Sequence, residues 1–568
     1  MPPAPERTVR DLADAYVASL ADLDPVLATM LGLESGAQGL PDLSPAGYQA
    51  QDELARTTLA KLNRLTSDVP SPSASGAERR CARLLRERLE TALAVSATGE
   101  QLRAVRNILG PVQGLQMMFT MMPVRSEADW SAIAKRIALV PQALAGYAVS
   151  LREGVARGLL APSRQVSAFT AQLQDWGAAG AGRGWFAQFC DAAQVPERLR
   201  AELDQAAVAA IASVGELRRW MLDDYAPRAE GVPDGVGAGR YRVLARAWLG
   251  AELDLADTYV WGWSEYRRIM AEMAEQAERV LPGATVPEAM SYLDEHGEAA
   301  EGVEEIRQQL QRILDERVAE LDGTHFDLPG PVKTVEARIA PPGSAAAPYY
   351  TRPSRDFSRP GRTWLPTLGQ TRFPLWKLVS TWHHEGVPGH HLQLGTWTTL
   401  AGELSTYQTS VGSVSAMTEG WALYAERLMD ELGYLSDPAA RLGYLEAQLR
   451  RAIRVIVDIG MHLQMELPAG ILPEAKNGRT WTPELAVEFF AAHTARSTTE
   501  FVTSEIVRYL GWPGQAISYK VGERAWLAGR EAARAAHGDA FDLKSWHTAA
   551  LSLGALGLDD LTTELALL

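Results

Sequence analysis

The chain has 568 residues, of which 46% are hydrophobic, enough to bury a large core. Its formal net charge of −15 at pH 7 would repel the phosphates of a nucleic acid or an anionic membrane, so we expect neither as a partner. The two cysteines, Cys81 and Cys190, exclude a disulfide framework and a thiolate zinc cluster.

Helical periodicity dominates the chain from its start. Residues 1–7 lack the basic and apolar regions of a signal peptide, so we expect a cytoplasmic protein. Apolar residues recur at spacings of three and four over 8–32, and charged residues lie between them. The same pattern recurs over 78–95, 128–158, 196–225, 252–281 and 299–321. We expect a mainly α fold with an N-terminal helical half, 1–334, and a C-terminal catalytic, metal-binding helical half, 335–568, in one continuous fold.

Residues 335–372 differ from the helical segments before them. They are rich in proline, glycine and aromatic residues, which favours a short extended or hairpin segment. Zinc peptidases often place a substrate-binding edge strand before the metal-binding helix. Tyr349 and Tyr350 are therefore candidate substrate contacts, with packing aromatics as the alternative.

The residues typical of metal chemistry follow directly. Histidines stand at 383, 384, 390 and 391, with Glu385 beside them. Imidazole nitrogens bind zinc, and a nearby carboxylate takes a proton from the attacking water, which predicts His384 as a ligand and Glu385 as the general base. The common motif H-E-x-x-H has its second histidine where Pro388 stands here.

This departure leaves the second ligand open. Six residues advance a regular helix by about 240°, so His384 and His390 would point apart on it. Proline and glycine break or bulge a helix, which could return His390 to the metal. We prefer His390 as the second ligand, and His391 is the alternative.

A third ligand is expected downstream, in an apolar helical segment. Glu419 and Glu426 are seven residues apart and share one face of it. A carboxylate among apolar side chains is costly unless it is paired or bound to a metal. We expect Glu419 to bind the metal and Glu426 to orient a histidine, with two solvated carboxylates as the alternative.

Two further groups are candidates for the site. Arg454, Asp458 and His462 recur every four residues on an apolar helix, either as a network near the active site with His462 catalytic, or as a structural ion pair. Tyr519 is a candidate hydrogen-bond donor to the oxyanion of an amide-cleaving reaction. The alternative for Tyr519 is a core tyrosine.

These blocks together resemble the zinc-peptidase-like family catalogued as domain of unknown function 885. The matching blocks are 384–393, 419–426, 458–462 and 513–520. The resemblance implies a mostly helical fold with a deep channel, similar to gluzincin peptidases such as angiotensin-converting enzyme and the thermostable carboxypeptidases. In those families a downstream glutamate is the third zinc ligand, which supports Glu419. Residues 466–481 resemble an insertion.

We therefore expect a zinc-dependent hydrolase of short peptides or related amides, with one zinc ion per chain. The same ligands also suit other divalent metals. One alternative is a metal-dependent biosynthetic enzyme that forms, cyclises or rearranges a modified amino acid or peptide. A non-catalytic metal-binding protein is the other.

Overall fold

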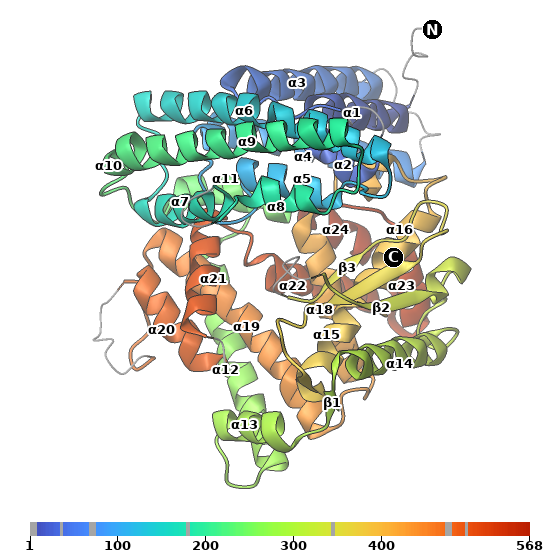
Figure 1. Ribbon diagram of the computed structural model, residues 1–568. Coiled ribbons are helices and arrows are strands. Elements are labelled where there is room, and N and C mark those ends of the chain that lie inside the picture. The colour runs from blue at the N-terminus through green and yellow to red at the C-terminus, as the bar shows by residue number, and fades with distance from the viewer. Residues whose placement is uncertain are drawn as a thin grey trace. The chain divides into compact units, whose positions relative to one another are not determined.

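The computed structural model describes residues 8–33, 38–67, 75–177, 182–341, 347–471, 480–494 and 498–568. Helices dominate these residues, which confirms the predicted mainly α fold (Figure 1). The chain divides into two compact units. Unit 1 is Met1–Ser71, Arg88–Val243 and Thr503–Trp512, and unit 2 is Pro72–Glu87, Leu244–Val502 and Pro513–Leu568. The division at 334/335 and the deep channel stay predictions.

Unit 1 is helical. Its helices are α1 (Val9–Leu23), α2 (Pro25–Leu31), α3 (Pro45–Ser67), α5 (Pro111–Met121), α6 (Glu127–Ala156), α7 (Ser163–Trp176), α8 (Trp185–Asp191), α9 (Glu197–Trp220) and α10 (Ala226–Arg228). Three helices have residues in both units: α4 (Gly76–Ala97), α11 (Gly237–Leu249) and α21 (Thr499–Gly511).

The long helix α6 shows why these segments are helical. The Ser126 hydroxyl accepts a hydrogen bond from the Asp129 N–H, and the Asp129 carboxylate accepts one from the Ser126 N–H. This reciprocal cap satisfies backbone donors that the first turn leaves without partners. The buried face of α6 then joins the apolar core of unit 1, together with side chains such as Phe119 and Phe169.

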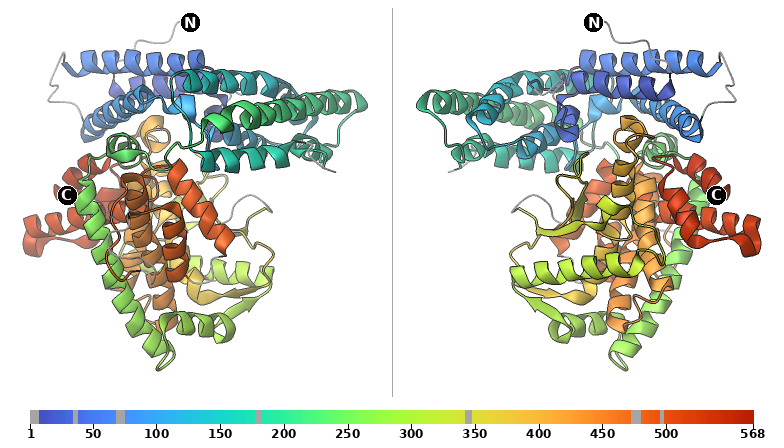
Figure 2. Two further views of the ribbon diagram at one scale, coloured as in Figure 1. Left: turned by 90° about the vertical axis from the view of Figure 1, so that its left-hand side faces the viewer. Right: turned by 90° about the vertical axis from the view of Figure 1, so that its right-hand side faces the viewer.

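Unit 2 contains the candidate metal ligands and the candidate catalytic residues named above. Its helices are α12 (Leu255–Val280), α13 (Val286–His296), α14 (Val303–Leu321), α15 (Leu378–Glu385), α16 (His390–Thr399), α17 (Thr406–Thr409), α18 (Ser415–Glu431), α19 (Pro438–Leu463), α20 (Pro483–His493), α22 (Ser518–His537), α23 (Leu543–Leu551) and α24 (Leu558–Ala566). The long helices α12 and α19 lie side by side (Figures 1 and 2), and α18 packs on α22.

Short strands precede the helix with the histidines, as the sequence predicts. Strand β2 (Val335–Ile339) runs parallel to β4 (Gly361–Leu365), which pairs antiparallel with β3 (Tyr349–Thr351). Strands β1 (Ala299–Glu301) and β5 (Arg372–Pro374) form a separate antiparallel pair.

The sheet and helix α15 share one apolar core with α14. Leu310 and Leu314 of α14 pack in it with Val335, Leu365 and, from α15, Trp382. This packing fixes α15 against the sheet, and so positions the histidines that end α15.

No helix in the described ranges is long and apolar enough to span a membrane. Of the insertion predicted at 466–481, residues 472–479 lie outside the described part of the chain.

Candidate metal centre

The helix that carries the first histidines ends abruptly, and the next begins only a few residues later. Helix α15 ends at Glu385 and α16 begins at His390. Gly389 makes this break possible, because a Cβ there would lie 1.9 Å from the carbonyl oxygen of His384. The rings of His384 and His390 thereby come within 4.8 Å of each other, at an angle of 85°.

Glu419 of α18 meets these two rings. Its Oε2 lies 3.4 Å from Nε2 of His384 and 3.5 Å from Nε2 of His390. One ligand atom from each of the three residues lies within 4.8 Å of the others. Zinc bonds of the usual length at tetrahedral angles would separate ligand atoms by about 3.4 Å, so these residues fit a zinc ion.

The electrostatics of the three residues also favour a cation between them. Burial would lower the pKa of His384, but hydrogen bonds to Glu419 and Glu426 outweigh it and raise the pKa to about 9. Burial would raise the pKa of Glu419, but His390 and His384 hold it well below its usual range. The carboxylate therefore stays ionised and attracts a positive charge, either a proton on an imidazole or a metal ion.

Glu426 lies seven residues after Glu419 on the same face of α18 and fixes the orientation of His384. Its Oε1 lies 2.8 Å from Nδ1 of His384, and its Oε2 accepts a hydrogen bond of 2.5 Å from the Ser380 hydroxyl. The Arg451 guanidinium lies 3.3 Å from Oε1 and compensates its charge. With Nδ1 donating to Glu426, the lone pair of His384 Nε2 faces Glu419, which is the arrangement that a metal-binding histidine needs.

Glu385 lies beside the three candidate ligands without being one of them. Together with His384, His390 and Glu419, it lines a pocket of about 360 Å³. Burial raises the pKa of the Glu385 carboxyl, an effect that the neighbouring histidines reduce. A carboxylate with a raised pKa is a stronger base and suits proton transfer near neutral pH.

Tyr519 enters the same pocket from the start of α22. Its ring stacks on His384 with centroids 6.5 Å apart and planes at 21°. Arg454 and Arg451 of α19 lie over the ring of Tyr519, at 5.1 and 5.9 Å from its centroid. Arg454 thus contacts Tyr519 and is not among the residues that line the pocket.

Two glycines let α18 and α22 cross closely enough to bring Glu419 and Tyr519 together. A Cβ on Gly420 would lie 2.4 Å from the carbonyl carbon of Gly522, and a Cβ on Gly522 would lie 1.9 Å from the carbonyl oxygen of Ala416. Any side chain at either glycine would push the helices apart, and with them the two pocket residues.

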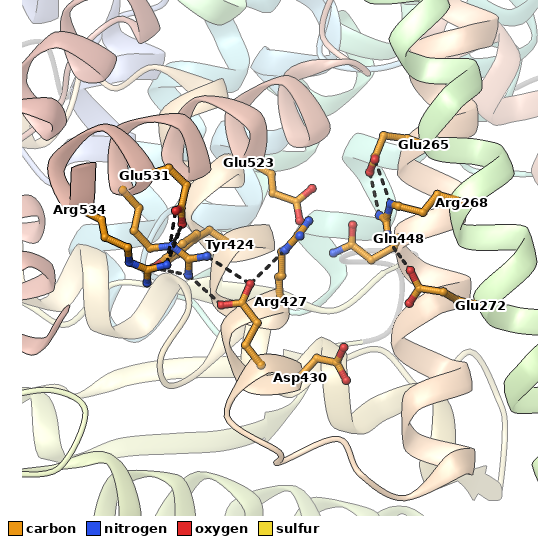
Figure 3. A network of polar contacts seen from close by, with 12 residues as sticks. Glu265, Arg268, Glu272, Tyr424, Arg427, Asp430, Gln448, Glu523, Glu531 and Arg534 are labelled. Carbon is orange, nitrogen blue, oxygen red and sulfur yellow. Dashed lines mark hydrogen bonds and ion pairs between the residues drawn. The ribbon is translucent and has the colours of Figure 1, made fainter. Parts of the chain in front are cut away.

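Charged side chains form ion pairs between these helices and their neighbours (Figure 3). Glu431 of α18 pairs with Arg530 of α22 at 2.8 Å and with Arg427 at 3.2 Å. Next to Tyr519, the buried Lys520 ammonium contacts Glu523 and lies 3.2 Å from Glu265 of α12. The Glu431 pairs are partly exposed and contribute little. The Lys520 pairs are buried, and such pairs define the relative placement of helices more than they add stability.

The structure does not bring every sequence candidate to the pocket. His391, the alternative ligand, uses both ring nitrogens elsewhere: Nε2 lies 2.7 Å from the Val332 carbonyl oxygen and Nδ1 lies 3.0 Å from the Tyr350 hydroxyl. Burial lowers the pKa of His391 to about 4, so the ring is neutral at pH 7. His391 positions Tyr350, and the prediction of His390 matches the geometry better.

His462, expected as a catalytic candidate, is not among the residues that line the pocket. It is buried in α19 with Nε2 3.7 Å from Asp458, whose other oxygen accepts a hydrogen bond of 2.9 Å from the Gly514 N–H. Asp458 thus anchors the turn before α22, whereas Arg454 of the same stripe contacts the pocket residue Tyr519, and the catalytic role of His462 stays a prediction.

The β segment contributes pocket residues, one of which the sequence analysis missed. Tyr349 and Tyr350 line the pocket, and Tyr349 also stacks on Trp364 with centroids 5.9 Å apart. Arg352 lines the pocket as well. Its position just after the tyrosines of a candidate substrate-binding strand was a signal that could have indicated it.

Two solved structures share this fold. One, described as the putative lipoprotein from Colwellia psychrerythraea, superposes with a TM-score of 0.82 at 24% identity over 98% of both chains. The other, described as a putative lipoprotein of unknown function from Shewanella oneidensis, gives a TM-score of 0.76 at 18% identity over 98% of this chain and 100% of that chain.

These descriptions correct one expectation. A lipoprotein is held at a membrane by its attached lipid, so the descriptions of both neighbours overturn the expected cytoplasmic location, and we withdraw it. No curated protein matches the chain. Residues 25–565 match the family described as "Bacterial protein of unknown function (DUF885)", and the chain therefore belongs to the DUF885 family.

Proposed function

We propose that this protein is a zinc-dependent hydrolase of short peptides or related small amides, of the zinc-peptidase-like kind. The observation that carries this proposal is the convergence of His384, His390 and Glu419, at distances that fit zinc, in one pocket with Glu385. Two imidazoles and a carboxylate are a ligand set of catalytic zinc sites, although other divalent metals bind similar sets. When bound, zinc supplies a Lewis acid that polarises the carbonyl group under attack.

The chain's own residues supply the proton transfers. Glu385 takes a proton from the attacking water and returns it to the leaving nitrogen, since it lies in the pocket and its pKa is raised. Tyr519 donates a hydrogen bond to the carbonyl oxygen as negative charge develops there. Glu426 keeps the His384 ring in one tautomer and one orientation.

The size of the pocket limits the substrate. Its volume of about 360 Å³ lies at the lower end of the range of roughly 300–1,000 Å³ for small-molecule sites. Tyr349 and Tyr350 contribute aromatic side chains to its lining. These features favour a substrate of a few residues over a folded protein.

Replacement of the base tests this mechanism. We expect the Glu385→Gln variant to lose at least about 100-fold in turnover of short peptides or amides, because general-base catalysis is worth roughly 10²–10⁴-fold. The variant should bind as much metal as the wild type, since Glu385 is not one of the converging ligands. Glu431→Gln, on the outer face of α18, is the matched control and should keep full turnover.

Other outcomes separate the alternatives. Undiminished turnover in Glu385→Gln would refute the role of this residue. A wild type that binds metal but hydrolyses none of a broad set of peptides and amides would favour the biosynthetic or the non-catalytic alternative.

A further inference from the structure

One cationic side chain in the pocket has no acidic partner. Arg352 follows strand β3 and lines the pocket with the three candidate ligands. Its guanidinium donates a hydrogen bond to the Thr409 carbonyl oxygen and lies over the Trp397 ring, 5.7 Å from the centroid. Among the residues that the structure describes, no carboxylate forms an ion pair with it, and the titratable group that acts on its charge is Tyr350.

Two other arginines of unit 2, Arg362 and Arg451, differ in this respect. Arg362 of β4 lies 2.8 Å from Glu336, and Arg451 lies 3.3 Å from Glu426. The Arg352 side chain is half-buried, and this burial lowers the pKa of its guanidinium. The Tyr350 phenol cannot compensate this charge at pH 7, because burial raises its own pKa above the usual value. A half-buried cation without an acidic partner is costly, so an anion from outside the chain would stabilise it.

We propose that Arg352 binds a carboxylate of the substrate, so that the enzyme acts on short peptides or N-acyl amino acids with a free carboxylate near the scissile bond. This inference rests on the proposed function, because Arg352 and the candidate metal ligands share one pocket. An arginine has five N–H donors in a planar fork, and those not bound to Thr409 can hold a carboxylate through two parallel hydrogen bonds.

The dimensions of the pocket agree with such a substrate. A sphere with the volume of the pocket is about 9 Å across, the length of two to three extended residues. A substrate whose carbonyl group lies at the metal ligands can therefore reach Arg352 with a carboxylate one or two residues away. A long chain that continues past Arg352 could offer only the carboxylate of an acidic side chain there.

Binding of product-like probes tests the proposal without turnover. We would measure the affinities of N-acetylalanine and N-acetylalanine amide by ligand-observed NMR, with zinc-loaded and with EDTA-treated protein. Charge-assisted hydrogen bonds predict that the carboxylate binds about 10- to 100-fold more tightly than the amide. This preference should persist after EDTA treatment, which excludes the metal as its source.

Variants assign the preference to one side chain. Arg352→Gln should abolish the preference for the carboxylate, whereas Arg355→Gln, an equal loss of charge at an exposed position of the same segment, should keep it. Arg352→Lys keeps the charge but loses the fork, so it should retain part of the preference. Thermal unfolding of each variant checks that it is folded.

A second pair of probes identifies the source of the carboxylate. N-acetylglutamate amide offers only a side-chain carboxylate, and N-acetylglutamine amide offers none. Preference for the first of these probes would assign Arg352 to an acidic side chain of the substrate, and preference for N-acetylalanine over its amide would assign it to the C-terminus.

Two results would overturn the inference: equal affinities within both pairs for the wild type, or a preference that survives unchanged in Arg352→Gln and Arg352→Lys. Failure of the proposed function would look different. It would show as a wild type without metal or without hydrolysis, whatever the affinities of these probes.

Discussion

The hydrogen bond between Glu426 and His384 offers a quantitative test of how the chain prepares its metal site. Glu426 is fully buried and contacts His384, Ser380 and Arg451 at 2.8, 2.5 and 3.3 Å. In Glu426→Gln the shape is kept, but the charge is lost and the amide NH₂ group faces donors on at least one side. His384 then loses the partner that directs its Nε2 toward Glu419.

Groups that orient a metal-binding histidine typically account for about 10–100-fold in metal affinity, or roughly 1.4–2.8 kcal/mol. We expect the zinc affinity of Glu426→Gln to fall by this factor, measured by competition with a chromogenic chelator. The matched control is Glu431→Gln on the same helix, whose carboxylate pairs with Arg530 at 2.8 Å. This variant should leave zinc affinity within about twofold of the wild type, because Glu431 shares no interaction partner with the candidate metal ligands among the described residues. An unchanged zinc affinity in Glu426→Gln would refute the orienting role.

Three further predictions concern the same site. Gly420→Ala places a Cβ 2.4 Å from Gly522, so it should destabilise the fold by about 1–3 kcal/mol and weaken zinc binding, as measured by thermal unfolding and metal titration. The control Gly402→Ala, whose Cβ would meet no atom within 4 Å, should leave both stability and zinc binding unchanged. The pKa of His384 in the metal-free protein is raised to about 9, so below that pH zinc must displace a proton. Apparent zinc affinity should therefore fall by up to about tenfold per pH unit as the pH drops from 9 toward 7, and a pH-independent affinity would contradict this. Lys520→Met leaves the acidic partners of the buried lysine without a counter-charge, so it should lower the free energy of unfolding in denaturant by about 3–5 kcal/mol. A decrease below about 1 kcal/mol would show that the ion pair is not buried in solution.

The sequence predicted those parts of the structure that depend on local patterns. Apolar spacings of three and four predicted the mainly α fold, which the structure confirms. A proline and two glycines between His384 and His390 predicted a helix break. The structure shows its physical reason, since only a glycine at Gly389 can approach the His384 carbonyl so closely.

Features that depend on distant neighbours were harder to predict. The spacing of Asp458 and His462 showed that they share a helix face, but not that Asp458 accepts a hydrogen bond from the Gly514 N–H. The position of Arg352 after the candidate tyrosines was a local signal, but its contacts with Thr409 and Trp397, which lie far from it in the sequence, could not be predicted. Periodicity carries no information about such pairings.

Metal content is the most direct test of the central claim, that His384, His390 and Glu419 form a zinc site. We would measure it by elemental mass spectrometry on the wild type beside His384→Ala and Glu419→Ala, with Glu431→Ala as the control on the outer face of α18. The account predicts one zinc ion per chain in the wild type and the control, and its loss in both ligand variants. A wild type without metal, or ligand variants that keep it, would contradict the account.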